Sequence, residues 1–186
     1  MQELSLNVLD IAQNSIRAGA DLIEIDVSKD TSSGMLEIRI CDNGCGMTKE
    51  QIDRVIDPFF TTRTTRKIGL GVPFFKMTAE MTGGTFSIDS EVGKGTVVCA
   101  TYHYQHIDML PLGDMPSTVI TLLSVNPQLD FVYRYRVNAE EFVFDTREVK
   151  QTLQGVAINE NEVLVFLKEL LQDNTAEIEA KTDEIV

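Results

Sequence analysis

The chain has 186 residues, 43% of them hydrophobic, which is enough for one domain with a proper core, with or without an appendage. Its formal net charge of −13 argues against a nucleic-acid-binding surface, because phosphate contacts need a basic face. No apolar run approaches the ~20 residues of a membrane span, and the N-terminus does not resemble a signal peptide. We therefore expect a cytoplasmic protein without a membrane or nucleic-acid partner. Three cysteines, an odd number, indicate free thiols.

A helix is the first expected element, running from Ser5 as its N-cap to a stop at Gly19. Its apolar residues recur at helical spacing and are Leu6, Leu9, Ala12 and Ile16. Asp10 and Asn14 are four residues apart and therefore share one face of this helix. A carboxylate and a carboxamide are hard oxygen donors, which suit a magnesium ion and the water that attacks a phosphate. The alternative is a solvated polar face without chemistry.

Two strands follow, over residues 20–27 and 35–41, because apolar and polar residues alternate in both, and we expect them to pair. The second strand leads directly into the turn Asp42-Asn43-Gly44-Cys45-Gly46. Asp42 can accept a hydrogen bond from an exocyclic amine, while Gly44 and Gly46 carry no Cβ atom, so a flat ring can approach. This pattern favours the recognition of a nucleotide base. The alternative is an Asp-Asn-Gly turn of no chemical consequence.

A loop over residues 60–71 separates a short expected helix over residues 48–56 from another over residues 72–81. Four threonines and three cations in this loop form no apolar face, and Gly69 and Gly71 supply hinge freedom, so we expect it to close on a ligand. The cations that could face a triphosphate are Arg63, Arg66 and Lys67. The N-terminal amides of the following helix form a further anion site. The alternative is an ordinary flexible loop.

A hairpin is expected over residues 83–102, with one strand on either side of Gly93-Lys94-Gly95. Thr96, at the start of the returning strand, places a hydroxyl near the strand ends where the ligand would lie.

In order and spacing, these pieces resemble the ATP-binding domain shared by gyrase, Hsp90, histidine kinases and the mismatch-repair protein MutL, called the GHKL or Bergerat-fold ATPases. The resemblance covers about Leu4 to Tyr104 and is closest to the catalytic domain of sensor histidine kinases, through residues 58–63 and Gly69-Leu70-Gly71. It implies an α/β (α+β) two-layer sandwich, in which helices cover one face of a mixed, largely antiparallel sheet. The ATP-binding domain is expected over residues 1–106.

The resemblance also implies roles for individual residues. Asn14 would coordinate magnesium, Asp42 would bind the adenine amine, and Thr96 would support that contact. The adenine pocket would be lined by Gly44 and Gly46, and the lid over the phosphates would contain Lys67, Gly69, Leu70 and Gly71. Asp10 would be the catalytic carboxylate, although many members carry glutamate there, and the shorter side chain favours slow activation of water. Lys67 replaces a glycine of the usual lid pattern and would contact phosphate or stiffen the lid.

Two functions follow from this resemblance. The first is a histidine-kinase-like ATPase or protein kinase that binds Mg-ATP and hydrolyses it, or transfers its phosphate to a separate partner protein in signalling, as anti-sigma-factor kinases do. The second is a slow or non-catalytic ATP-dependent switch that regulates a partner. His103 and His106 follow the last expected strand of the domain and are expected to be surface residues. We therefore expect no phosphoacceptor domain of its own.

Residues 107–186 are expected to form a small α+β extension that adds to the sheet or binds a partner. The pattern predicts helices over residues 113–124 and 161–171, a strand over residues 129–137 and its hairpin partner over residues 141–145. The acidic tail from about residue 173 is expected to fray.

Overall fold

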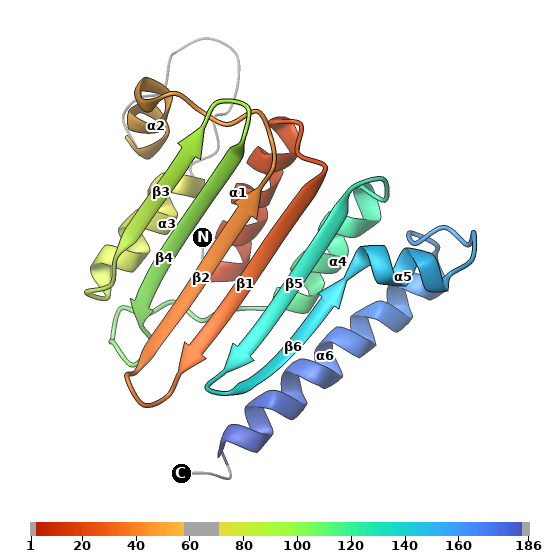
Figure 1. Ribbon diagram of the computed structural model, residues 1–186. Coiled ribbons are helices and arrows are strands. Elements are labelled where there is room, and N and C mark those ends of the chain that lie inside the picture. The colour runs from red at the N-terminus through yellow and green to blue at the C-terminus, as the bar shows by residue number, and fades with distance from the viewer. Residues whose placement is uncertain (1–2, 58–70, 184–186) are drawn as a thin grey trace.

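The computed structural model describes residues 3–57 and 71–183 as a mixed sheet of six strands with helices on one face (Figure 1). The strands are β1 (Leu22–Asp30), β2 (Met35–Asp42), β3 (Phe86–Glu91), β4 (Gly95–His103), β5 (Asp130–Val137) and β6 (Glu140–Asp145). The helices are α1 (Leu4–Arg17), α2 (Lys49–Ile56), α3 (Gly71–Met81), α4 (Met115–Val125), α5 (Thr146–Thr152) and α6 (Asn161–Asp183). None of these helices is both long and apolar enough to cross a bilayer.

The order of the strands is β3-β4-β2-β1-β5-β6. β1 and β5 run parallel, and the other four neighbouring pairs are antiparallel. In Figure 1, α1, α3, α4 and α6 lie behind the sheet and leave its front face open. The predicted two-layer sandwich with a largely antiparallel sheet is therefore confirmed.

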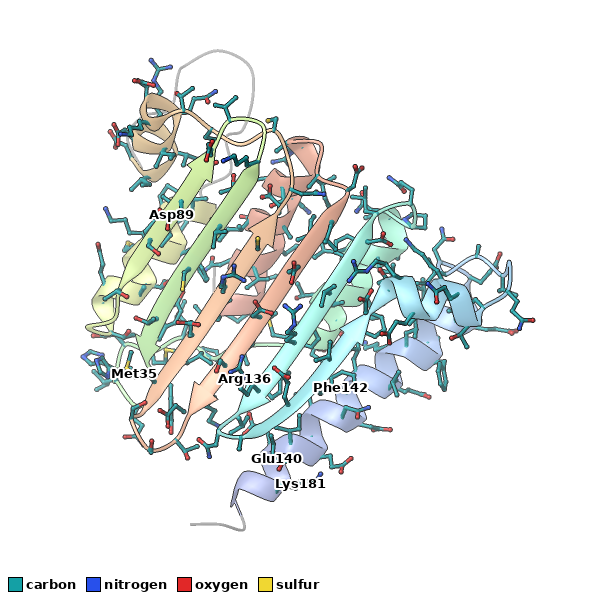
Figure 2. The ribbon with its side chains drawn as sticks, viewed as in Figure 1. Met35, Asp89, Arg136, Glu140, Phe142 and Lys181 are labelled. Atoms are coloured by element: carbon teal, nitrogen blue, oxygen red, sulfur yellow. The ribbon has the colours of Figure 1, made fainter. Side chains whose placement is uncertain are left out.

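Alternation along the strands decides which face is covered. Ile23, Ile25 and Val27 of β1 are at most 1% exposed and pack in the core with the helices. The residues between them face the open side, where Arg134 of β5 lies 2.7 Å from carboxylate oxygens of both Glu24 and Asp26. Arg136, two residues further along β5, lies on the same open side (Figure 2). The alternation of apolar and polar residues that predicted these strands therefore matches the alternation of buried and more exposed side chains along them.

The start of α1 corrects one prediction. Ser5 is not the N-cap, because the helix already begins at Leu4, after Glu3, and Ser5 is buried inside it. Glu3 makes no side-chain cap. Instead, the backbone N–H groups of Leu4 and Ser5 donate to the carbonyls of Pro111 and Leu112, at 3.0 and 2.9 Å. A distant segment therefore satisfies amide groups that a local cap usually satisfies.

The second half of the chain extends the sheet through β5, all of which pairs with β1, from Leu22 to Lys29. The prediction that the acidic tail frays from about residue 173 is wrong, because α6 continues to Asp183. Ile178 is only 5% exposed, and Glu179 lies 2.8 Å from Lys29 Nζ on β1. Burial of an apolar side chain and pairing with a strand residue hold this segment in place, although its composition is acidic.

Hydrogen bonds in the turn between β1 and β2 lower the pKa of Asp30, and this effect can be measured. The hydroxyls of Ser32 and Ser33, followed by their backbone N–H groups, donate to the Asp30 carboxylate and lower its pKa from the ordinary 3.8 to about 2. Because the folded pKa is the lower one, the resulting stabilisation is present above pH 3.8 and is lost as the pH falls through 2. We expect the Asp30 carboxyl carbon to titrate near pH 2 by NMR. In the double variant Ser32→Ala, Ser33→Ala its midpoint should move upward, and an unchanged midpoint would contradict this assignment.

Candidate functional site

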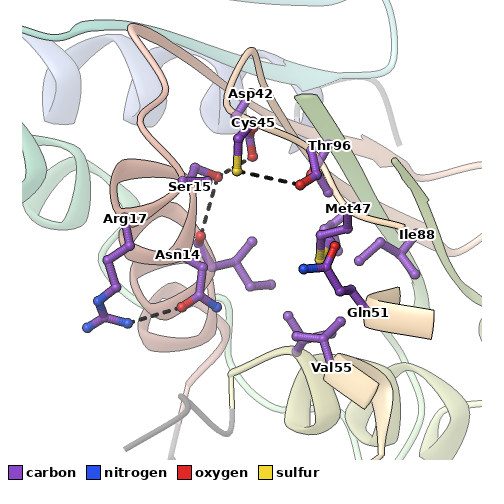
Figure 3. A pocket seen from close by; sticks show the side chains of 15 residues that line it. Asn14, Ser15, Arg17, Asp42, Cys45, Met47, Gln51, Val55, Ile88 and Thr96 are labelled. Carbon is purple, nitrogen blue, oxygen red and sulfur yellow. Dashed lines mark hydrogen bonds between the residues drawn. The ribbon is translucent and has the colours of Figure 1, made fainter. Parts of the chain in front are cut away.

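A pocket of about 540 Å³ lies where α1, α2 and α3 meet the ends of β2, β3 and β4 (Figure 3). Its apolar lining comes from Ile11, Met47, Val55, Val72, Ile88 and Val98. Its polar lining comes from Asn14, Ser15, Arg17, Asp42, Gln51 and Thr96. Apolar walls with a few convergent polar groups are typical of a small-molecule site. The volume and the lining suit a flat heteroaromatic ring.

Asp42 is the polar centre of this pocket. It ends β2 and is only 9% exposed. Ser15 Oγ on α1 donates to Asp42 Oδ2 at 2.6 Å, and the Gly44 backbone N–H donates to Oδ1 at 2.9 Å. Each oxygen of an ionised carboxylate has a further lone pair, so both can still accept from a ligand. The two protein donors fix the carboxylate before any ligand arrives.

Glycine is required at two positions near Asp42, because another segment of the backbone passes so close that a Cβ atom would not fit. Gly46 has φ +65°, and a Cβ atom there would lie 2.0 Å from the Glu91 carbonyl oxygen. Gly95 has φ +112°, and a Cβ atom there would lie 1.9 Å from the carbonyl oxygen of Asp42. Gly44 lies beside Asp42 and against Ala18, the residue just after α1. Gly46 lines the pocket, whereas Gly44 does not line it and instead donates its backbone N–H to Asp42.

Thr96 lies opposite Asp42 in the register between β2 and β4 and also lines the pocket. Its hydroxyl is 2.8 Å from Ser90 Oγ on β3, which accepts the backbone N–H of Met47 at 2.8 Å. The hydroxyls therefore connect the hairpin of β3 and β4 to the turn after Asp42.

On α1, Asn14 lines the pocket, and its Oδ1 accepts a hydrogen bond from Arg17 Nη1 at 3.1 Å. Asp10, one turn earlier, is not among the described residues that line the pocket. It packs against the first residue of α3, since a Cβ atom at Gly71 would lie 2.6 Å from Asp10 Cβ. The structure thus brings Asn14, Asp42, Gly46 and Thr96 to one pocket, with Asp10 and Gly71 in contact. The predicted lid residues Lys67, Gly69 and Leu70 lie outside the described residues.

Several pocket residues were not predicted from the sequence. Ser15 lies 27 residues before the carboxylate that it contacts, and a serine on a helix carries no signal for such a contact. Gln51 and Ile88 reach the pocket from α2 and β3. Asn43 does not line the pocket and was expected only as a turn residue, yet its Oδ1 accepts the backbone N–H groups of both Asp21 and Leu22. These two bonds hold the turn against the start of β1.

Removing the hydroxyl of Ser15 should loosen Asp42 and weaken the binding of a ligand in this pocket. We expect Ser15→Ala to reduce the affinity for ATP, the ligand that the resemblance implies, by about tenfold, which corresponds to ~1.4 kcal/mol, the scale of one charge-assisted hydrogen bond. Isothermal titration calorimetry measures this change. Ser15 Oγ also lies 3.5 Å from the Ile11 carbonyl oxygen within α1. Ser124→Ala is the matched control, because the Ser124 hydroxyl likewise donates to a helix carbonyl but belongs to α4, away from the pocket. Equal affinities of the two variants would contradict the role of Ser15.

The family of the chain follows from comparison with known proteins. The model of the family described as histidine kinase-, DNA gyrase B-, and HSP90-like ATPase matches residues 2–106. The chain belongs to this family, and the resemblance inferred from its motifs is confirmed.

Individual relatives agree with this assignment. The chain is 31% identical over 94 residues to sporulation kinase D of Bacillus subtilis (strain 168), covering 50% of the chain and 18% of that protein. It is 32% identical over 89 residues to the sensor histidine kinase ZraS of Escherichia coli (strain K12), covering 48% and 19%. Among solved structures, the N-terminal domain of a DNA repair protein shares the fold, with a TM-score of 0.53, 14% identity, and coverage of 77% of this chain and 52% of that one. The chain therefore spans less than a fifth of the length of these two kinases.

Proposed function

We propose that this protein binds ATP with magnesium in the pocket around Asp42 and that it hydrolyses the ATP or transfers its phosphate to a separate protein. The observation that carries the proposal is the buried carboxylate of Asp42, which Ser15 and Gly44 orient at the floor of an apolar pocket. An exocyclic amine such as that of adenine could donate to this carboxylate. Guanine would present a carbonyl oxygen there instead, and two facing acceptors repel each other.

The residues near the pocket fit a magnesium ion that is held mainly by its nucleotide. Within the described residues, no group of three or more histidine, cysteine or acidic side chains could hold an ion alone. Magnesium commonly binds through one or two protein oxygens together with substrate phosphates. Asn14 Oδ1 would supply such an oxygen, and Arg17 would supply positive charge beside it. When bound, the ion would neutralise charge on the phosphates.

The phosphates would extend from Asp42 toward α1 and the start of α3. Asn14 and Arg17 line the pocket from α1, and Val72 lines it from the first turn of α3. In our proposal, the amide groups at this helix start meet the phosphates, and Lys67, Gly69, Leu70 and Gly71 belong to a lid that covers them. The site of action would be the cytoplasm, where ATP and signalling partners are available.

A second candidate function is an ATP-dependent switch with little turnover. It is favoured by Asp10, which packs against Gly71 and does not line the described pocket. A carboxylate one methylene shorter than glutamate reaches a water beside the phosphates less well. In this case ATP binding would alter the surface offered to a partner protein.

A single-turnover incubation with γ-labelled ATP and magnesium separates these functions. Free labelled phosphate would support an ATPase, label on a protein from an added cell extract would support a kinase, and bound but unchanged ATP would support the switch. Asp10→Asn is the informative variant, because it should retain ATP binding and lose any turnover that needs the carboxylate. If the wild-type protein does not retain ATP at all, the proposal is wrong.

A further inference from the structure

A second cavity, of about 400 Å³, lies on the helix-covered side of the sheet, at the opposite end of β2 from Asp42. Its walls come from the ends of β1, β2 and β5, from α6 near its C-terminal end, and from the segment that joins β4 to α4. In Figure 1 this segment crosses behind the sheet. Neither the family motifs nor the nucleotide pocket includes any residue of this cavity.

One end of the cavity is charged. Lys29 Nζ lies 2.8 Å from Glu179 Oε2, and the two side chains are 26% and 34% exposed. The hydroxyl of Tyr135 donates to the other oxygen of Glu179. Lys29 Nζ also lies 5.5 Å from the centroid of the Tyr104 ring. A cation, an anion, a hydroxyl and an aromatic face are therefore gathered within one cavity wall.

Apart from His106, the other walls are apolar. Leu36 of β2 is 4% exposed, and the connecting segment adds Met109, Leu110 and Leu112, which pack partly buried against the core. This segment is held in place, because Pro111 and Leu112 accept hydrogen bonds from the first turn of α1. The cavity is thus formed before any ligand binds.

We propose that this cavity binds an α-amino acid with an apolar side chain. Lys29 Nζ has three N–H donors and the Glu179 carboxylate has several lone pairs, so both can bind a ligand while they remain paired with each other. A simple carboxylate would bind Lys29 but be repelled by Glu179, and a simple amine would bind Glu179 but be repelled by Lys29. An α-amino acid matches both charges at once, with its carboxylate on Lys29 and its ammonium on Glu179. Its side chain then lies against Leu36 and Leu112.

The test uses methyl NMR of the full chain titrated with L-leucine and L-phenylalanine. We expect saturable shifts at the leucines of the cavity wall, Leu36, Leu110 and Leu112, with a dissociation constant in the millimolar range, as befits a ligand of about ten heavy atoms. Ile88 and Val72 in the nucleotide pocket should not shift. If neither amino acid gives saturable shifts at the cavity leucines, the proposal is wrong.

Matched ligands and variants test the role of the charges. 4-Methylpentanoate lacks the ammonium of leucine and 3-methylbutylamine lacks its carboxylate, and each should bind at least about tenfold more weakly. Lys29→Gln and Glu179→Gln should each weaken L-leucine binding to a similar extent, whereas Glu141→Gln, which removes the partner of Arg136 elsewhere on the sheet, should not. Equal binding of the carboxylate and the amino acid would overturn the assignment. Thermal unfolding of each variant separates lost binding from lost folding.

Discussion

Asp42→Asn is expected to weaken ATP binding by about 100-fold, which corresponds to ~2.7 kcal/mol. Both oxygens of the carboxylate are already engaged, one by Ser15 and the other by the Gly44 backbone N–H. Asparagine has only one acceptor oxygen in its side chain. Its amide group must therefore face either a protein donor or the adenine amine, and one hydrogen bond is lost in each case. Isothermal titration calorimetry with Mg-ATP measures the change.

Asp89→Asn is the control for this experiment. It makes the same chemical change on the exposed side of β3 (Figure 2) and should leave ATP affinity unchanged. Because Asp42 also supports the turn after β2, thermal unfolding of both variants should be recorded. If a folded Asp42→Asn protein bound ATP as tightly as the wild type, the base would not be bound by this residue.

Phe75→Ala is expected to lower the free energy of unfolding by about 3–5 kcal/mol, the usual cost of truncating a fully buried phenylalanine. Phe75 is 0% exposed on α3, and its ring packs edge-to-face with the Tyr102 ring at a centroid distance of 5.9 Å. The loss combines unburied apolar surface with a cavity between α3 and the sheet. Denaturant unfolding followed by circular dichroism measures it.

Phe166 provides the matched control, because its side chain on α6 is 62% exposed. Phe166→Ala should change the free energy of unfolding by less than about 0.5 kcal/mol. Similar losses for the two variants would mean that α3 does not pack on the sheet as described.

Features with a local cause could be predicted from the sequence. Alternation identified β1 and β2, because one face of the sheet is covered and the other is open. Gly19 was expected to stop the first helix, and it has φ +75° just after α1. The turn at Asp42 also followed from a local pattern, a carboxylate at a strand end beside glycines. The structure places Asp42 on one pocket with Asn14 and Thr96.

Features that depend on distant residues could not be predicted. Ser5 was taken for an N-cap because nothing nearby indicates that Pro111 and Leu112 complete the first turn of α1. The end of α6 was expected to fray because its acidic composition hides the pairing of Glu179 with Lys29, 150 residues earlier. The contact of Ser15 with Asp42 is of the same kind. Each depends on the assembled sheet and not on local propensity.

The proposed function requires that adenine binds to Asp42 in the pocket between α1 and β4. A crystal structure of the protein with magnesium and a non-hydrolysable ATP analogue would show where the base lies. We predict that the exocyclic amine of adenine donates to a carboxylate oxygen of Asp42, with the ring between Ile88 and the apolar residues of α1 and α3. A nucleotide bound elsewhere, or an adenine amine that faces solvent, would contradict the proposed function.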